Sequence, residues 1–372
     1  MSELLVNTIK KADGTGSLSV PAESGTVVTT ASPSLGRRNL IINGAGMIHQ
    51  RGGTINNGAS AYIYGLDRWA LYGNDAADFS IAQDSSTAPA EFINSIKVTS
   101  LAATTAAGAY GLAQKIEGLN SSHLRFGSSG AQTITASFWV RSSITGTYAF
   151  SLFNSGGNRS YISEYTISAA DTWEYKTVTV VGDTSGTWLN TSGIGVIAWW
   201  DLGSSSGFNN TKDQWNATLD TRTTSTVDWI ATNGATFYIT GVQLEVGSVA
   251  SSYEHRSYGE ELALCQRYYE QVGNGASALA NSSTQFWTGY TFKVEKRAEP
   301  TASVIASTVR YFKFGLANRD NSSPSIGGGY YSPRSSIILI EGFSGLTANE
   351  SAMSGGSITN HRDVIFAFDA EL

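Results

Sequence analysis

The stretch from Phe237 to Glu270, FYITGVQLEVGSVASSYEHRSYGEELALCQRYYE, contains the end of one kind of structure and the start of another. Its first part alternates apolar and polar residues up to Val246, with one interruption at Thr240 and Gly241. Period-two alternation is typical of a half-buried strand, and a glycine at an interruption indicates a bulge. We therefore expect a strand that ends at Gly247 and carries a bulge at Gly241.

From Gly259 onward the apolar residues follow a helical spacing. Leu262, Cys265 and Tyr269 fall at i, i+3 and i+7, behind an acidic pair in the first turn. This pattern predicts a short amphipathic helix within residues 258–271. Cys265 is the only cysteine and lies on the apolar stripe, so we expect a buried packing residue and no disulfide within the chain. A β-domain therefore closes near Val246, and a second β-rich segment follows the helix.

Alternating segments also recur before this stretch, separated by clusters of Ser, Gly, Asn and Asp. They predict strands at 79–83, 95–99, 110–116, 132–141, 147–153, 175–181, 194–202 and 236–246. Many short strands with turn signals and little helix indicate a β-sandwich, and the lack of a repeat of about 20–50 residues argues against a β-helix or a propeller. We expect this sandwich to occupy residues 37–252.

The rest of the chain, residues 273–372, predicts a second and smaller β-domain. Its predicted strands are 285–294, 301–305, 309–314, 335–341 and 363–371. We expect a loop at Gly327–Gly329. The last strand is apolar on both faces, which predicts burial between sheets or between subunits.

The composition excludes several classes of protein. Only 15% of the residues are charged, the net charge is −6, and the 24 Lys and Arg residues are scattered, which argues against a nucleic-acid surface. We expect no membrane insertion and no secretory signal, because apolar runs of sufficient length are absent from the sequence. A surface rich in Gly, Ser, Thr and Asn suits sugar recognition, and it suits extracellular structural proteins equally well.

Three blocks of sequence resemble bacteriophage tail-fibre and receptor-binding proteins. The most specific is the join of GVQLEVG at 241–247 to CQRYYE at 265–270, and the others are NLIING at 39–44 and the N-terminal segment at 5–30. The resemblance implies a homotrimer located in the virion tail. It also implies that residues 1–36 attach to a phage tail or baseplate protein, that 253–272 form a linking helix, and that 273–372 form a tip that contacts the host.

The N-terminal segment is too short to build a core of its own. Its strand-like pieces are 4–9, 17–20 and 26–29. We expect them to pair with other copies or with a partner protein. By contrast, Asp67 and Arg68 are expected to have a structural role at the edge of the sandwich.

The order of tryptophans in the first domain is similar to that of jelly-roll carbohydrate-binding modules. Trp173 precedes the strand TVTVVGD, and Trp188 and then Trp200 follow it. The resemblance implies a jelly-roll sandwich in which these three residues are candidate glycan contacts, because aromatic faces stack on pyranose rings. The alternative is a structural role, since neighbouring Trp199 and Trp200 point to opposite faces of a strand and at least one belongs in the core. Modules of this kind often hold a structural calcium ion, and no ligands are assigned.

The C-terminal domain contains the favoured candidates for contact with a host polysaccharide or lipopolysaccharide. They are Asn318, Arg319, Asp320, Tyr330 and Tyr331. Tyr and Asn on loops suit adaptable recognition. The alternative is that the aromatic residues of this domain fill a trimer core, which we favour for Trp287 and Phe312.

No pattern of catalytic residues stands out among the 30 acidic residues and four histidines. Glycosidases need two carboxylates across the scissile bond, and no spacing in the sequence singles out such a pair. We therefore expect a protein that is not an enzyme and needs no cofactor. Two alternatives stay open, namely a polysaccharide depolymerase and a structural baseplate or decoration subunit without a ligand.

Overall fold

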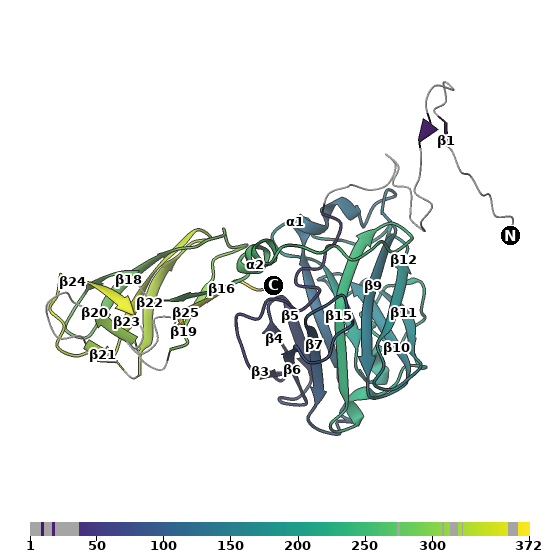
Figure 1. The fold of residues 1–372 in the computed structure, drawn as a ribbon, viewed down its shortest axis with the longest axis horizontal. Helices are drawn as coiled ribbons and strands as arrows, with labels where there is room; N and C mark the ends of the chain where they lie inside the picture. Colours follow the sequence, from purple (N-terminus) through teal and green to yellow (C-terminus); the bar gives the residue numbers. More distant parts are fainter. Residues whose placement is uncertain are drawn as a thin grey trace. The chain divides into compact units, whose positions relative to one another are not determined.

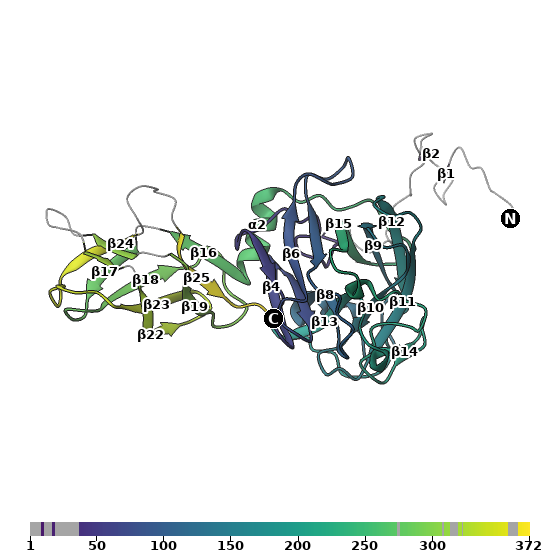
Figure 2. The same ribbon diagram turned by 90° about the horizontal axis from the view of Figure 1, so that it is seen from below.

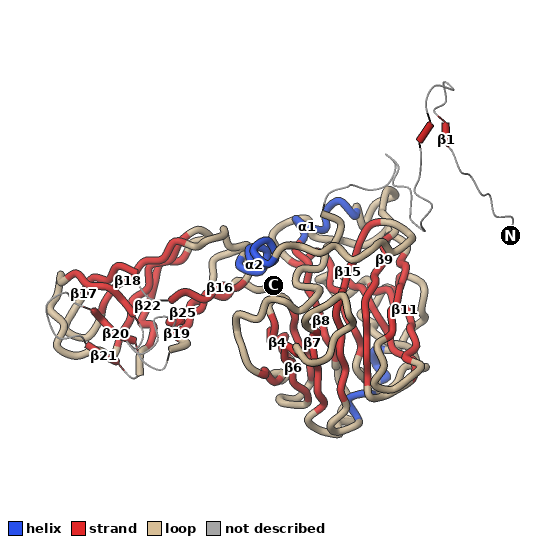
Figure 3. The backbone as a smooth tube through the Cα atoms, viewed as in Figure 1, coloured by secondary structure: helices blue, strands red, loops and turns tan. Residues whose placement is uncertain are grey.

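A computed structural model describes residues 9–10, 17–18, 37–273, 276–306, 309–312, 319–321, 323–355 and 364–372. The chain divides into two compact units, Met1–Arg38 and Asn39–Leu372. In the first unit, β1 (Ile9–Lys10) pairs with β2 (Ser17–Leu18) in antiparallel fashion. The remaining positions of the N-terminal strand predictions lie outside the described residues. Strands dominate the second unit (Figure 3).

Two antiparallel sheets form a jelly-roll sandwich, as expected (Figure 1). One sheet has the order β14 (Trp215–Asn216), β11 (Ser160–Ile167), β10 (Gly146–Phe153), β13 (Ile194–Asp201), β8 (Gly111–Glu117), β5 (Trp69–Gly73) and β4 (Ala61–Leu66). The other has the order β12 (Glu174–Val180), β9 (Ile134–Ser142), β15 (Thr236–Val246), β7 (Ser95–Ser100), β6 (Phe79–Asp84) and β3 (Thr54–Asn56). Figure 2 shows the two layers facing each other.

The sandwich core consists of the inward side chains of both sheets. Phe138 of β9 reaches across to Phe150 and Trp200 of the opposite sheet, with ring centroids 6.3 and 5.7 Å apart. Trp199 points the other way from Trp200 and is also buried, in a smaller cluster that includes Phe153. Burial of a large aromatic side chain stabilises the fold by about 1.5–3 kcal/mol.

The predicted bulge in β15 is present. The pairing of β15 with β9 shifts register between Thr240 and Gln243, and Gly241 has a φ of 60°. A β-carbon at Gly241 would lie 2.4 Å from the ring of Phe92. Glycine is therefore needed at this position both for the backbone conformation and for the close approach of Phe92.

The eight predicted strands of the sandwich are confirmed, and their ends shift by at most two residues. The prediction omits β3, β4, β5, β11 and β14. The hairpin of β4 and β5 was missed because its turn consists of Asp67 and Arg68, and Arg68 adopts a positive φ of 71° that is uncommon for arginine.

The helix α2 (Tyr258–Gln266) follows the sandwich. The Ser257 side chain caps its first turn by accepting a hydrogen bond from the amide of Glu260, and Cys265 is fully buried as expected. The predicted helix was too long at its end. Tyr269 already belongs to the next strand, where it pairs with Asp369.

The C-terminal strands form two further antiparallel sheets. One has the order β21 (Arg319–Asn321), β20 (Val309–Phe312), β24 (Ser351–Gly355), β17 (Ala276–Ala280), β18 (Phe286–Thr291), β23 (Ser335–Glu341) and β22 (Ser325–Tyr331). The other places β25 (Val364–Asp369) between β16 (Tyr269–Gly273) and β19 (Thr301–Val304). Phe286 and Phe368 lie in their shared core. The expected loop at Gly327–Gly329 is wrong, because these glycines lie inside β22, next to a bulge.

A largely buried group of charges, which we call the C-terminal clamp, holds the end of the chain against the sandwich; only Asp369 in it is substantially exposed. It consists of Arg51, Arg68, Lys115, Asp369 and Glu371. Arg68 forms an ion pair with Glu371, and Arg51 lies 3.1 Å from Asp369 and 3.6 Å from Glu371. Lys115 donates to the carbonyl of the last residue at 2.5 Å. Burial raises the pKa of Glu371 and lowers that of Lys115 to about 8.

The clamp predicts a non-additive effect of substitutions. Arg68→Met leaves Glu371 buried without its main partner, so we expect a loss of about 3–5 kcal/mol in the free energy of unfolding. Adding Glu371→Gln removes the orphaned charge, and the double variant should be more stable than Arg68→Met alone. Urea unfolding followed by tryptophan fluorescence measures both values. A double variant as unstable as the sum of the single variants would contradict a coupled pair.

The bulge predicts a second effect on stability. Gly241→Ala combines an unfavourable positive φ with a clash against Phe92, so we expect it to lower the free energy of unfolding by roughly 2–4 kcal/mol. Gly234→Ala is the matched control, since Gly234 has a φ of 79° with no atom near its β-carbon position. The control should cost only the backbone strain of about 1–2 kcal/mol. Equal losses in urea unfolding would show that the packing of Phe92 is unimportant.

Candidate functional sites

The outer surface of the seven-stranded C-terminal sheet has an apolar area, which we call the Trp287 face. It consists of Leu279, Trp287, Tyr330, Ile337 and Leu339. Phe286 points into the core, so its neighbour Trp287 points outward. The rings of Trp287 and Tyr330 are 6.0 Å apart and inclined by 33°. Tyr330 is 73% exposed, and Leu279 and Ile337 are 44% and 48% exposed.

A hollow of about 450 Å³ lies within this face. It is lined by Ser277, Ala278, Leu279, Trp287, Thr288, Gly289, Ile337 and Ser351. Gly289 leaves the space open, because a β-carbon there would meet only a side-chain atom of Ile337, at 3.9 Å. The surface thus combines an aromatic wall with hydroxyl groups at its rim, which is the combination that binds the apolar face and the hydroxyls of a pyranose.

The structure separates the predicted residues of the C-terminal domain. Tyr330 belongs to the Trp287 face and is exposed, as a residue that contacts a ligand must be. Tyr331 is its neighbour in a strand and points the opposite way, packs against the C-terminal core, and has a pKa raised by burial. The two tyrosines therefore do not form one contact surface, and a receptor contact by Tyr331 stays a prediction. Asp320 is exposed in β21, while Asn318 and the side chain of Arg319 lie outside the described residues.

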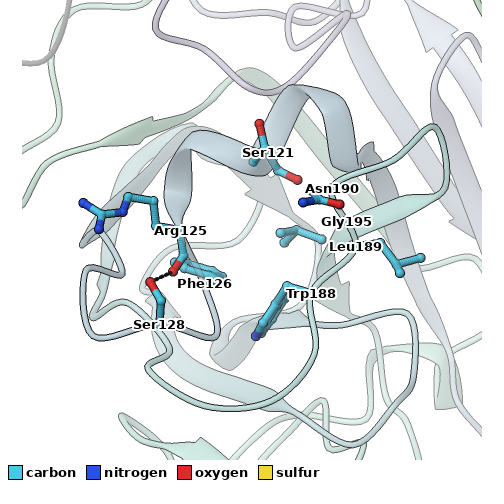
Figure 4. A pocket seen from close by; sticks show the side chains of 10 residues that line it. Ser121, Arg125, Phe126, Ser128, Trp188, Leu189, Asn190 and Gly195 are labelled. Carbon is cyan, nitrogen blue, oxygen red and sulfur yellow. Dashed lines mark hydrogen bonds between the residues drawn. The ribbon is translucent and has the colours of Figure 1, made fainter.

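A second candidate site on the sandwich, the Trp188 groove, is a hollow of about 270 Å³. Its lining includes Ser121, Arg125, Phe126, Trp188 and Asn190, and Figure 4 shows Phe126, Trp188 and Asn190 around the hollow. These residues come from the segment after β8, which contains α1 (Gly118–Ser121) and the short helix Ser122–Leu124, and from the loop between β12 and β13. The groove therefore joins loops that lie far apart in the sequence.

The loop that presents Trp188 is held in place by specific contacts. The Trp188 indole donates to the carbonyl of Ser185 at 3.1 Å, and its ring meets Phe126 and Trp215 edge-on at 5.0 and 5.4 Å. Arg159 donates two hydrogen bonds to Asp183 in the same loop, at 2.6 and 2.7 Å, and this pairing raises the pKa of Arg159. A bidentate pair fixes both partners strongly, so the aromatic wall of the groove is preorganised.

The three predicted tryptophans of the sandwich have different environments. Trp188 lines the groove. Trp173 is half-buried and packs edge-on against Tyr238, with ring centroids 6.3 Å apart. Trp200 is 0% exposed, because the alternation of β13 turns it inward. A side chain without surface has no access to a sugar, so the prediction of Trp200 as a glycan contact is wrong.

Sequence reasoning missed Ile337 and favoured a trimer core for Trp287. The sequence of β23, SSIILIE, does indicate that Ile337 is special, because it places apolar side chains on both faces of the strand. A strand with one face on the core normally carries polar residues on the other, so its second apolar face marks a surface with a further role.

The described part of the chain has neither a candidate metal-binding cluster nor a helix that could span a membrane. No group of three or more His, Cys, Asp or Glu side chains there is arranged to hold a metal ion. The structural calcium ion stays a prediction. Within the same residues no helix has the length and apolar character needed to span a bilayer.

Comparison with known proteins finds distant structural likenesses. No family model and no curated protein matches the sequence. The chain is similar to the enzymatically active domain of tailspike protein 4 of bacteriophage CBA120, with 12% identity, a TM-score of 0.31, and coverage of 56% of this chain and 21% of that one. It therefore spans about a fifth of the tailspike structure.

Two further structures are matched over their full length. One is a putative sugar binding protein from Bacteroides thetaiotaomicron, with 15% identity, a TM-score of 0.31 and coverage of 56% of this chain. The other is TmCBM61 in complex with β-1,4-galactotriose, with 11% identity, a TM-score of 0.28 and coverage of 57% of this chain. Identities and TM-scores this low carry no conclusion about function.

The outward orientation of the Trp287 face predicts how two substitutions change the free energy of unfolding. Tyr330→Ala removes a side chain that is mostly in water, so we expect a change below about 1 kcal/mol in the free energy of unfolding. Phe286→Ala removes a fully buried ring from the inner face of the same sheet and should cost about 3–5 kcal/mol. Urea unfolding distinguishes the two. A large loss for Tyr330→Ala would mean that this face is covered rather than free.

Proposed function

We propose that this chain is a bacteriophage tail-fibre subunit whose C-terminal domain binds a glycan on the host cell surface. The proposal has two supports. The first is the resemblance of the join at 241–270, and of the N-terminal segment, to phage fibre proteins. The second carries the binding function, and it is the pair of half-buried Trp287 and exposed Tyr330 beside a hollow with hydroxyl groups at its rim.

The Trp287 face suits weak and repeated binding. Stacking of the apolar face of a sugar on an aromatic ring buries little area, and the hydroxyls of Ser277 and Ser351 at the rim add modest hydrogen bonds. One such site gives a low affinity. In a homotrimer with three tips on one body, the second and third contacts become intramolecular and the avidity rises by orders of magnitude.

In this proposal the N-terminal residues 1–36 attach the subunit to a tail or baseplate protein, and the subunit acts outside the cell as part of the virion. The glycan is held and not cleaved. The Trp188 groove is a second candidate contact on the same chain, because it also presents an aromatic wall beside Asn and Ser side chains.

The experiment measures binding of the fluorescently labelled full-length protein to a panel of bacterial strains by flow cytometry. We expect Trp287→Ala/Tyr330→Ala to weaken binding at least about tenfold, because both stacking surfaces are lost. Tyr175→Ala is the matched control, since Tyr175 is a 45% exposed aromatic residue on the sandwich. The control should bind like the unmodified protein.

Other outcomes point to other functions. Unchanged binding by the double variant together with loss of binding by Trp188→Ala would transfer the receptor site to the sandwich. Release of new reducing ends from the polysaccharide of a bound strain would favour a depolymerase. Binding to no strain, by a protein that forms the expected trimer, would favour a structural subunit.

A further inference from the structure

Besides the Trp188 groove, the sandwich has another hollowed surface, which we call the polar trough. It consists of two adjoining hollows of about 620 and 460 Å³ that share Asn209 and Thr224 in their linings. The segment 203–228, between β13 and the short helix Trp229–Ala231, supplies most of the trough. Among the described residues that line it, none is aromatic, and hydroxyl and amide side chains prevail.

The floor of the trough is rigid because a buried arginine holds it. Arg222 donates to the hydroxyl and carbonyl oxygens of Thr226 at 2.8 and 2.6 Å, to Asp228 at 2.6 Å, and to the carbonyl of Ser204. The hydrogen bonds of Arg222 thus connect Ser204, near the start of segment 203–228, with Thr226 and Asp228 near its end. A surface fixed in this way loses little conformational entropy when a ligand binds.

The charges within the trough cancel locally. Arg222 is paired with Asp228, and Lys212 with Glu164 at 2.5 Å. Neither pair leaves an excess charge to attract an anion or a cation. The trough therefore suits a neutral ligand that is recognised through hydrogen bonds.

Asn209 provides the binding group. Asn209 lines both hollows, and no group in the described part of the protein donates a hydrogen bond to its Oδ1 atom. In the present rotamer this atom is buried, so the side chain must rotate toward the trough before a ligand hydroxyl can donate to it. The rotation relieves a buried acceptor without a donor, which costs about 1–3 kcal/mol, and the new hydrogen bond would lie at the middle of the trough.

We propose that the polar trough binds an internal segment of a neutral, hydroxyl-rich polysaccharide, with Asn209 Oδ1 accepting a hydrogen bond from a sugar hydroxyl. Two hollows in a row accommodate consecutive sugars of a chain. The absence of aromatic side chains among the described lining residues makes recognition depend on hydroxyl geometry. The inference rests on the proposed glycan-binding function, and it assigns to the sandwich a site separate from the Trp287 face.

The test uses the full-length protein and purified sugars. Saturation-transfer NMR and calorimetric titration are carried out with neutral gluco-, galacto- and manno-oligosaccharides of increasing length, with the single hexoses, and with polygalacturonate as the charged comparison. We expect binding of at least one neutral series, with affinity rising from the single hexose to the longer oligomers, and weaker binding of polygalacturonate.

Variants locate the binding. Asn209→Ala should weaken it about tenfold, and Asn209→Asp, which keeps the oxygen, should weaken it less. In a protein that also carries Trp287→Ala/Tyr330→Ala, Thr224→Trp fills the position shared by the hollows and should abolish binding, whereas Thr177→Trp, at an exposed position in β12, should leave it unchanged. Circular dichroism confirms that each variant is folded.

The proposal is overturned if no neutral oligosaccharide binds, if Thr224→Trp binds like the unmodified protein, or if a single hexose binds as tightly as the longest oligomer. Trp287→Ala/Tyr330→Ala should keep the oligosaccharide affinity of the trough. Loss of cell binding in that double variant with retained oligosaccharide binding therefore separates the function of the C-terminal face from that of the trough.

Discussion

The buried ion pair between Arg68 and Glu371 is the contact on which the arrangement of residues 39–372 depends. Arg68 comes from the turn of an early hairpin, and Glu371 is the penultimate residue, so the pair joins segments at opposite ends of the folded unit. A buried pair often contributes little net stability, because desolvation offsets the attraction between the charges. The pair mainly fixes the position of the C-terminal segment, because displacement of that segment would leave a buried charge without its partner. The ring of Tyr268 lies 3.5 Å from the Arg68 guanidinium and brings the end of α2 into the same contact.

A second ion pair extends this connection. Arg267, which follows α2, donates to the carboxylate of Glu117 at 2.6 and 2.9 Å, and Glu117 ends a central strand of the sandwich. Hydrogen bonds from Arg267 and Tyr268 lower the pKa of Glu117, although burial alone would raise it. The contact of Arg68 with Tyr268 and the ion pair of Arg267 with Glu117 therefore hold the end of helix α2 against the sandwich. The sequence motif CQRYYE contains the residues that make these contacts, which explains why it marks the join between the two β-rich parts.

Alternation predicted most of the strands but not the face that each side chain occupies. It located β15 and β23 with correct ends, because each is an apolar segment bounded by turn residues. It failed at β22, where three consecutive glycines resemble a loop although they pair with β23. It also failed to separate the inward Trp200 from a surface residue, since Trp199 and Trp200 are both apolar and the period alone does not identify the core side. The sequence indicated Trp188, but it did not indicate Phe126 and Asn190 beside it in the groove, because these residues meet only in the fold. The polar trough was missed because its lining consists of hydroxyl and amide residues that resemble an ordinary loop.

The strands with two apolar faces explain where binding surfaces arise. In the sandwich, the outward Trp199 is covered by Tyr62 and Tyr72. Trp199 is consequently buried. In the C-terminal sheet the equivalent outward residues Trp287 and Ile337 keep a surface shared with the exposed Tyr330. Apolar area left in water costs free energy in an isolated chain, so a face of this kind is retained where contact with a partner or ligand offsets the cost. The contrast between the covered sheet of the sandwich and the open sheet of the C-terminal domain is therefore the physical reason for proposing receptor contact on the Trp287 face.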